Sequence, residues 1–202
     1  MRRQQQEWEQ KPMKEEIQQQ VNMLVGIAQI LSYIVRVWCS RLGTIGERYG
    51  GHQGILSIIA FPVGALMIAG PDAADYEPVL IGVFMLCTLA RMFAHGQERR
   101  RLANQGIHPF HSQYGGTSVF WKTGDDEIRV KQHTESTVCV FAGIVTLILS
   151  KGLGIMFIVC GVANAIAEEF ERLKQLAIER QLRDAMAEQE YARYMMDKVR
   201  KQ

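Results

Sequence analysis

Residues 137–167 read TVCVFAGIVTLILSKGLGIMFIVCGVANAIA, with Lys151 as the only charged residue. As one helix, this stretch would be about 46 Å long and would carry the lysine near its middle. A lysine at the centre of a bilayer costs roughly 2.5–3.5 kcal/mol, whereas a lysine in a turn among the headgroups costs little. Gly152 and Gly154 also suit a turn. We therefore predict that 136–167 forms a hairpin of two short transmembrane helices turning at 150–154, with one long helix as the alternative.

The rest of the chain also keeps its charges apart from its apolar stretches. It has 202 residues, with 23 Lys and Arg, 21 Asp and Glu, and a formal net charge of +2. Four windows contain none of these charged residues: 49–71, 78–90, 136–150 and 152–167. Soluble domains distribute charge through their elements, whereas polytopic membrane proteins segregate it. The pattern argues against a soluble enzyme, a disordered chain or a secreted disulfide module, and so small a net charge does not indicate a nucleic-acid partner.

A first transmembrane hairpin is predicted over 54–95. Residues 54–70 read GILSIIAFPVGALMIAG and end at Gly70, which is followed by proline and so terminates a helix. The second helix starts at Pro78, a favourable first position, and runs to about His95. Together with the hairpin above, this predicts an all-α membrane protein with four short transmembrane helices in two hairpins.

Basic residues lie on one side of this arrangement. The two short loops, 71–77 and 150–154, hold a single basic residue, Lys151, and the first loop holds three acidic ones. Fourteen arginines and lysines flank the helices on the other side. Because basic flanks stay inside, we predict a multi-pass protein of the cytoplasmic (inner) membrane, with both termini and 96–135 in the cytoplasm. A three-helix arrangement would export the basic C-terminal segment, so the asymmetry disfavours it.

The N-terminal region is predicted as a polar tail, 1–16, followed by an amphipathic helix, 17–40. A narrow polar stripe runs along this helix at spacings of three and four, and its other positions are apolar. The pattern fits a helix in the cytoplasmic interface, or packed on the bundle, with its polar edge in water. A fifth spanning helix over 17–35, with the stripe facing a partner helix, is the alternative. The stripe consists of Asn22, Gly26, Gln29, Tyr33, Arg36 and Ser40.

The cytoplasmic insert, 96–135, contains a strand signal. Its first residues extend the preceding helix as far as Gly106, which stops it. Residues 118–122 (SVFWK) and 127–131 (EIRVK) then flank a turn-like segment, and the second run alternates polar and apolar residues strictly. This predicts a small β-hairpin. Because an isolated hairpin is marginal in water, it needs a surface such as the headgroups, the bundle or another subunit.

The C-terminal region, 168–202, is predicted as a charged cytoplasmic helix, since it lacks proline and glycine. Apolar residues recur along it at alternating spacings of four and three, interrupted at Gln189. Such a heptad seam favours a coiled coil between copies of the chain, or a helix docked on a partner. A single solvated helix is the alternative. The apolar seam positions are Ile178, Leu182, Ala185, Ala192, Met196 and Val199.

Small residues within the membrane segments predict close helix packing. Gly64 follows Ala60 and Ala165 follows Gly161 at spacings of four, which lets neighbouring helices approach. Asn164 is the one clearly polar amide of the last segment. We interpret it as a hydrogen-bonding contact between helices rather than a substrate ligand.

Histidines are the only residues that suggest a metal, and they do so weakly. His108 and His111 are three apart in the insert, and His95 and His133 fall on the same predicted side of the membrane. The spacing matches no zinc signature, and Pro109 disfavours a helix that presents both rings. The sequence also has no nucleotide-binding loop and no nucleophile motif. We therefore predict no metal, no cofactor and no catalytic residue.

These features predict a non-enzymatic membrane subunit, acting as a scaffold or assembly component of a larger complex such as a secretion or conjugation apparatus. Its expected partners are the lipid bilayer, further copies of itself and other subunits of the complex, and not nucleic acid. One alternative is a homo-oligomeric ion channel or pore with Asp72, Asp75 and Glu77 at its mouth. A second is a metal-dependent membrane enzyme that uses His108 and His111.

Overall fold

The structure, a computed structural model, describes residues 2–46, 52–71, 73–107, 116–122 and 126–200. Side chains are described throughout these ranges except at 2–18, 52–53, 194 and 197–200. All regular elements in the described part are helical, which confirms the predicted all-α class. In chain order they are α1 (Arg2–Cys39), α3 (His52–Ala69), α4 (Glu77–Asn104), α5 (Glu127–Arg129), the π-helix η1 (Val130–Glu135), α6 (Ser136–Thr146) and α7 (Lys151–Arg200).

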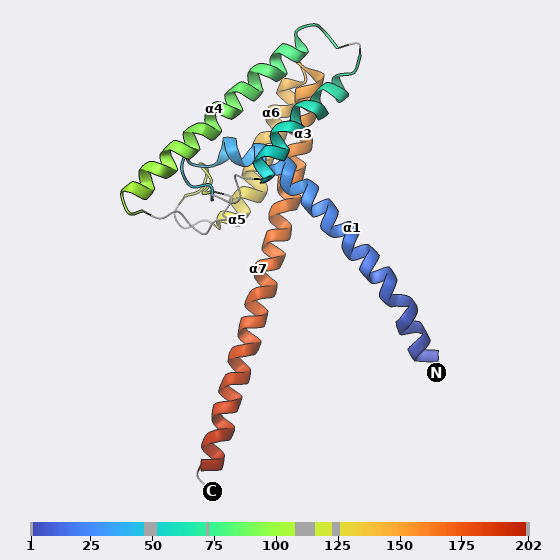
Figure 1. Cartoon of the computed structure of the whole chain (residues 1–202), viewed down its shortest axis with the longest axis vertical. Coiled ribbons are helices and arrows are strands. Elements are labelled where there is room, and N and C mark those ends of the chain that lie inside the picture. The colour runs from blue at the N-terminus through green and yellow to red at the C-terminus, as the bar shows by residue number, and fades with distance from the viewer. Residues whose placement is uncertain (1, 47–51, 72, 108–115, 123–125, 201–202) are drawn as a thin grey trace.

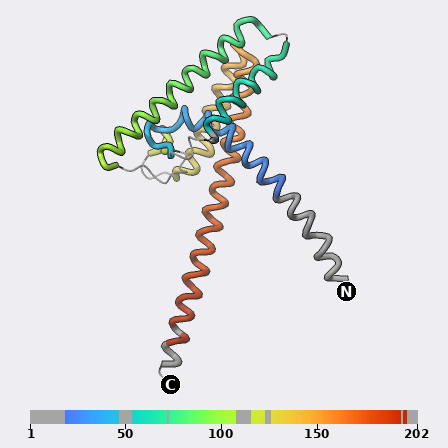
Figure 2. Tube along the Cα trace, viewed as in Figure 1, coloured from blue at the N-terminus to red at the C-terminus, as the bar shows by residue number. Residues whose placement is uncertain are grey.

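The helices form a bundle from which two helices diverge (Figure 1). α3 and α4 run in opposite directions as one pair, and α6 and the first half of α7 form another. The α3–α4 connection and the α6–α7 turn lie at one end of the bundle, which we name the short-loop end. The described N-terminal part of α1 and the second half of α7 leave from the opposite end, the tail end, and separate as they do so (Figure 2).

The core lies where the C-terminal end of α1 meets α3, α4 and α7. Ile34, Phe61 and Cys160 are almost completely buried there. Phe61, Phe84 and Phe157 come from three different helices, and their ring centroids are 4.9 to 5.8 Å apart. Such aromatic pairs contribute about 0.5–1.5 kcal/mol each beyond the apolar area that they bury. The three rings therefore hold α3, α4 and α7 together.

The second predicted hairpin forms two separate helices, but its turn comes earlier than predicted. α6 and α7 are joined at 147–150, so Gly152 and Gly154 lie inside α7. There they allow close contact between helices rather than a turn: a Cβ at Gly152 would overlap the carbonyl oxygen of Ala65 in α3. The alternative of one long helix over 137–167 is therefore wrong.

The predicted β-hairpin over 118–131 is also wrong. Residues 127–135 are helical, as α5 and η1. Ser118 makes only an isolated antiparallel bridge with Ser40, at the end of α1. The segment around Ser118 thus packs on the end of α1 instead of pairing with the residues that follow it.

Two local contacts stabilise the helix that replaces the predicted second strand. The carboxylate of Asp126 accepts a hydrogen bond from the backbone amide of Ile128 at 3.1 Å and so caps the first turn. Lys131 pairs with Glu127, four residues before it, at 2.8 Å. Alternation over only five residues is compatible with these contacts, so the short pattern did not distinguish a strand from a helix.

α1 differs from its prediction in two ways. It begins at Arg2, so the stretch predicted as a polar tail belongs to the same helix from that residue onward. Its polar stripe was expected to lie in water, but Tyr33, Arg36 and Ser40 are buried. The stripe turns inward near the end of α1 because Asn164 and Glu168 of α7 face Arg36, and Arg91 of α4 donates to the Ser40 carbonyl.

The outside of the bundle is apolar, while its inside is partly polar. Large apolar side chains lie exposed on α3, α4, α6 and α7, among them Met67 at 77% and Leu86 at 68% exposure. Ser57, Thr88 and Asn164 are buried instead. Soluble monomers rarely expose extended apolar patches, whereas lipid tails are themselves an apolar solvent. This inversion indicates that the bundle is embedded in a membrane.

Three helices in the described part of the chain are long and apolar enough to cross a membrane: Gln19–Cys39, Glu77–Asn104 and Lys151–Arg193. The apolar stretch Gly54–Ala69 is shorter, and α6 has 11 residues. This set differs from the four predicted segments in two ways. It includes Gln19–Cys39, which was expected in the interface with a spanning helix over 17–35 as the alternative, and it leaves out 54–69 and α6.

Candidate functional site

Polar residues of α1, η1 and α7 meet in a buried ionic cluster, which comprises Arg36, Lys131, Glu135, Asn164 and Glu168. At its centre, Arg36 Nη2 lies 2.8 Å from Glu168 Oε1, and the two side chains are 9% and 5% exposed. Arg36 lies on the polar stripe of α1, while Asn164 and Glu168 are one turn apart on α7 and share a face. An ion pair at this depth ties the two helices together, because removing either partner leaves an unpaired buried charge.

Asn164 connects this ion pair to the start of α6. Its Oδ1 lies 3.5 Å from Arg36 Nε, and its Nδ2 donates to the Lys131 carbonyl at 3.2 Å and to Ser136 Oγ at 3.1 Å. The side chain is completely buried, and both ends of its amide have partners. The structure thus places Asn164 where α1, η1, α6 and α7 meet.

Glu135 is completely buried, and in the described part of the chain neither of its carboxylate oxygens has a hydrogen-bond partner. Lys131, one turn earlier, pairs with Glu127 instead. Burial raises the pKa of Glu135 to about 7; the Ser118 hydroxyl, near but outside hydrogen-bonding geometry, and the charges of Lys131 and Arg36 limit the rise. Glu135 is therefore a buried member of the cluster that takes up a proton when the pH falls below about 7.

This pKa predicts that stability falls as the pH rises. The protonated acid favours the folded state fully below the unfolded pKa of 4.5, and that contribution is lost as the pH rises through the folded pKa of about 7. We expect the free energy of unfolding to fall by about 2–3 kcal/mol between about pH 4 and about pH 8, and Glu135→Gln to remove this fall. Unfolding in mild detergent, followed by tryptophan fluorescence at each pH, measures it. The exposed Glu171→Gln is the control; a wild-type slope in Glu135→Gln would contradict the assignment.

A second group of polar contacts fixes the C-terminal end of α1 to α4. Arg91 donates to the carbonyls of Val37, Trp38 and Ser40 at 2.7, 2.9 and 3.2 Å, and its guanidinium lies 5.5 Å from the centroid of the Trp38 ring. His95 Nε2 lies 3.1 Å from the same Val37 carbonyl. The carbonyls at a helix end lack partners and carry partial negative charge, so a cation there stabilises the helix. Arg91 and His95 therefore cap α1, which gives His95 a structural role.

The other histidines considered as metal ligands are not brought together in the described ranges. His133 is exposed on η1, and His108 and His111 lie outside the described residues. Among the residues that the structure does describe, no group of three or more His, Cys, Asp and Glu side chains is arranged to hold a metal ion. The arrangement of the described residues therefore does not support the metal-enzyme alternative.

Glu77, considered as part of an acidic mouth, is buried at the short-loop end. Its Oε1 accepts a hydrogen bond from the backbone amide of Lys151 at 2.7 Å, where α7 begins. A carboxylate is favoured there because the first amides of a helix lack partners and carry partial positive charge. Asp75 is exposed, and Asp72 lies outside the described residues. Glu77 thus caps α7 and does not face an open mouth.

The two glycines predicted to pack between helices both lie at such contacts. A Cβ at Gly64 would lie 3.0 Å from the sulfur of Met156 in α7, and a Cβ at Gly161 would lie 2.8 Å from Val140 in α6. Ala165 is half-buried on α7. Together with Gly152, these positions set how closely α3, α6 and α7 approach one another.

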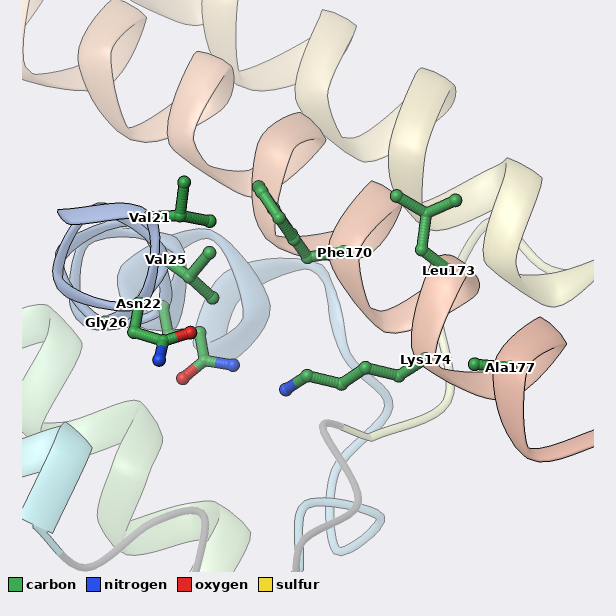
Figure 3. Close-up of a pocket in the computed structure, with 9 residues that line it drawn as sticks. Val21, Asn22, Val25, Gly26, Phe170, Leu173, Lys174 and Ala177 are labelled. Atoms are coloured by element: carbon green, nitrogen blue, oxygen red, sulfur yellow. The ribbon is translucent and has the colours of Figure 1, made fainter. Parts of the chain in front are cut away.

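α1 and α7 separate just beyond the ionic cluster. The space between them, about 540 Å³ in volume, is lined mainly by apolar side chains of both helices. Figure 3 shows Val21 and Val25 of α1 facing Phe170 of α7, with Lys174 extending along the edge. Ala177 is the residue of α7 farthest along the chain that lines this space. The residues that line this space therefore end one position before the heptad seam begins at Ile178.

The heptad seam of α7 is exposed wherever its side chains are described. Every residue from 173 to 193 is exposed, so within the described structure nothing covers this part of the helix. The exposed residues include large apolar side chains: Ile178 is 56% exposed, Leu182 59% and Met196 71%. The remaining seam positions are the exposed Ala185, Gln189 and Ala192 and also Val199, whose side chain lies outside the described set.

Sequence reasoning missed three members of the ionic cluster: Lys131, Glu135 and Glu168. Arg36 and Asn164 stood out locally, as a stripe residue and a polar amide, but their contact joins positions 128 residues apart and no local pattern predicts it. The sequence did contain one signal for two of these residues: Glu135 and Glu168 directly border the uncharged windows 136–150 and 152–167. No protein-family model, curated protein or solved structure matches this chain, so its function is inferred from its own geometry.

Proposed function

We propose that the protein is a non-enzymatic membrane subunit that anchors in the bilayer by its bundle and presents α7 for assembly, as a scaffold component of a larger membrane complex such as a secretion or conjugation apparatus. The observation that carries this proposal is the second half of α7. It is a long helix with large apolar side chains at heptad spacing, and none of its described residues beyond Ala177 is covered by the rest of the chain. A helix of this kind is marginal in water unless its apolar face packs on a partner.

In the proposed topology, the bundle lies in the inner membrane as two hairpins, 54–95 and 136–167. Both tails then lie in the cytoplasm. This topology is supported by the opposite directions of the helices in each pair and by the exit of α1 and α7 from the same end. The basic residues that flank the tail end favour the cytoplasmic side.

Self-association is the first expected consequence. We expect the purified protein in mild detergent or nanodiscs to form oligomers, and Leu182→Asp to weaken this association at least tenfold, about 1.4 kcal/mol, because a seam position would then bury a charge. Mass photometry over a dilution series measures the change. Ala187→Asp, which puts the same charge on the face opposite the seam, is the control and should leave association unchanged. A wild-type protein that stays monomeric at every concentration and retains no other membrane subunit would overturn the proposal.

A further inference from the structure

The exposed part of α7 carries enough pattern to specify how it pairs. Its apolar spacing defines a heptad register in which Leu182, Gln189 and Met196 occupy a positions. The d positions of the same register are Ile178, Ala185, Ala192 and Val199. Each of these a and d positions whose side chain the structure describes is exposed, so another helix can pack on the seam.

Charged residues flank this seam in a complementary pattern. Lys174 and Glu188 occupy g positions, and Glu179 and Arg193 occupy e positions. In a parallel, in-register coiled coil, each g residue faces the e residue five positions later on the other helix. Lys174 then faces Glu179 of the second copy, and Glu188 faces Arg193 of the second copy. Both pairs are attractive, and all four side chains are exposed in the single chain.

The antiparallel alternative has less favourable charges. When two copies of the seam run in opposite directions with the longest overlap, g residues face g residues, and Glu188 lies against Glu188 of the other copy. Like charges placed together oppose association. The membrane also favours the parallel pair, because α7 leaves the bilayer in the same direction in two copies that are inserted in the same orientation.

We propose that the partner of α7 is α7 of a second copy, paired in parallel and in register, with Gln189 facing Gln189 and with Glu188 bound to Arg193 across the interface. This rests on the proposed function, since it names the partner and geometry of the same surface. A polar residue at a single a position selects register at a cost in stability. The seam is short and contains two alanines, so the shared membrane, which raises the effective concentration of the copies, contributes to pairing.

Disulfide trapping in the membrane tests the geometry. In the full chain with Cys39, Cys87, Cys139 and Cys160 replaced by serine or alanine, Leu182→Cys should form a covalent dimer under mild oxidation, because identical a positions face each other only in a parallel, in-register pair. Ala187→Cys, an exposed f position, is the matched control and should not form a dimer. Efficient trapping only when Leu182→Cys and Ala192→Cys proteins are mixed would indicate antiparallel pairing, in which a positions face d positions, and would overturn the inference.

A charge exchange tests the flanking pair. Glu188→Arg and Arg193→Glu should each weaken association, by about 2–5-fold, and the double exchange should restore it toward wild type. If the protein associates but the exchange restores nothing and Leu182→Cys does not trap, the parallel geometry is wrong while the scaffold function stands. If mass photometry and trapping both show only monomers and a partner subunit co-purifies, pairing between copies is wrong and docking on that partner replaces it.

Discussion

Glu168→Ala is expected to lower the free energy of unfolding by about 3–5 kcal/mol. The carboxylate lies 2.8 Å from Arg36, and both side chains are nearly fully buried between α1 and α7. Removing it leaves the guanidinium without its charged partner in a medium that solvates charge poorly, which is the costly case for a buried ion pair. Equilibrium unfolding of the purified protein in mild detergent, followed by tryptophan fluorescence, to which Trp38 at the end of α1 contributes, measures the change.

Two further variants separate the ion pair from a general effect on α7. Arg36→Met with Glu168→Met removes both charges and fills similar volume, so it should recover most of the loss. Glu179→Ala removes a carboxylate from an exposed pair, whose side chains are 61% and 80% exposed, and should change little. Equal losses for Glu168→Ala and Glu179→Ala would show that Arg36 and Glu168 do not form the contact described here.

Gly152→Leu should cost at least about 3 kcal/mol, at the upper end of the usual cost of overpacking. A side chain at this position would overlap the carbonyl oxygen of Ala65, and a backbone atom has no rotamer by which to move away. α3 and α7 would have to separate, which would also loosen the aromatic contact between Phe61 and Phe157. Thermal unfolding in mild detergent, compared with wild type, gives the loss.

Gly82→Leu is the matched control for this substitution. Gly82 lies on the exposed face of α4, and a Cβ there meets nothing within 4 Å. The same change should therefore be neutral or stabilising, by up to about 1 kcal/mol, because leucine favours a helix more than glycine does. A comparable loss at both positions would mean that Gly152 does not mark a close approach between α3 and α7.

The helix ends that local chemistry determines could be predicted from the sequence. Gly70 and Gly106 follow α3 and α4, as expected, and both have positive φ, +79° and +76°, which glycine adopts without strain. α4 begins one residue before Pro78, with proline in its first turn. The division of 136–167 into two helices also followed from one charged residue between two apolar runs.

Contacts between distant segments could not be predicted in this way. The polar stripe of α1 has the same spacing whether it faces water or a polar helix, so the burial of Arg36 depends on Glu168, far along the chain. The segment around Glu127 alternates like a strand, but an N-cap and an i, i+4 ion pair decide for a helix. Gly152 suits a turn and a close contact equally well, and only the position of α3 shows which applies.

The central claim is that the bundle lies in lipid, with its short-loop end on one face of the membrane and the second half of α7 on the other. Labelling of single cysteines with a membrane-impermeant maleimide tests it most directly, in the cysteine-free background. We expect Ala74→Cys and Ile148→Cys to react in right-side-out vesicles, and Glu188→Cys to react only in inverted ones. Reaction of Ala74→Cys and Glu188→Cys from the same face, or release of the protein from membranes without detergent, would contradict the account.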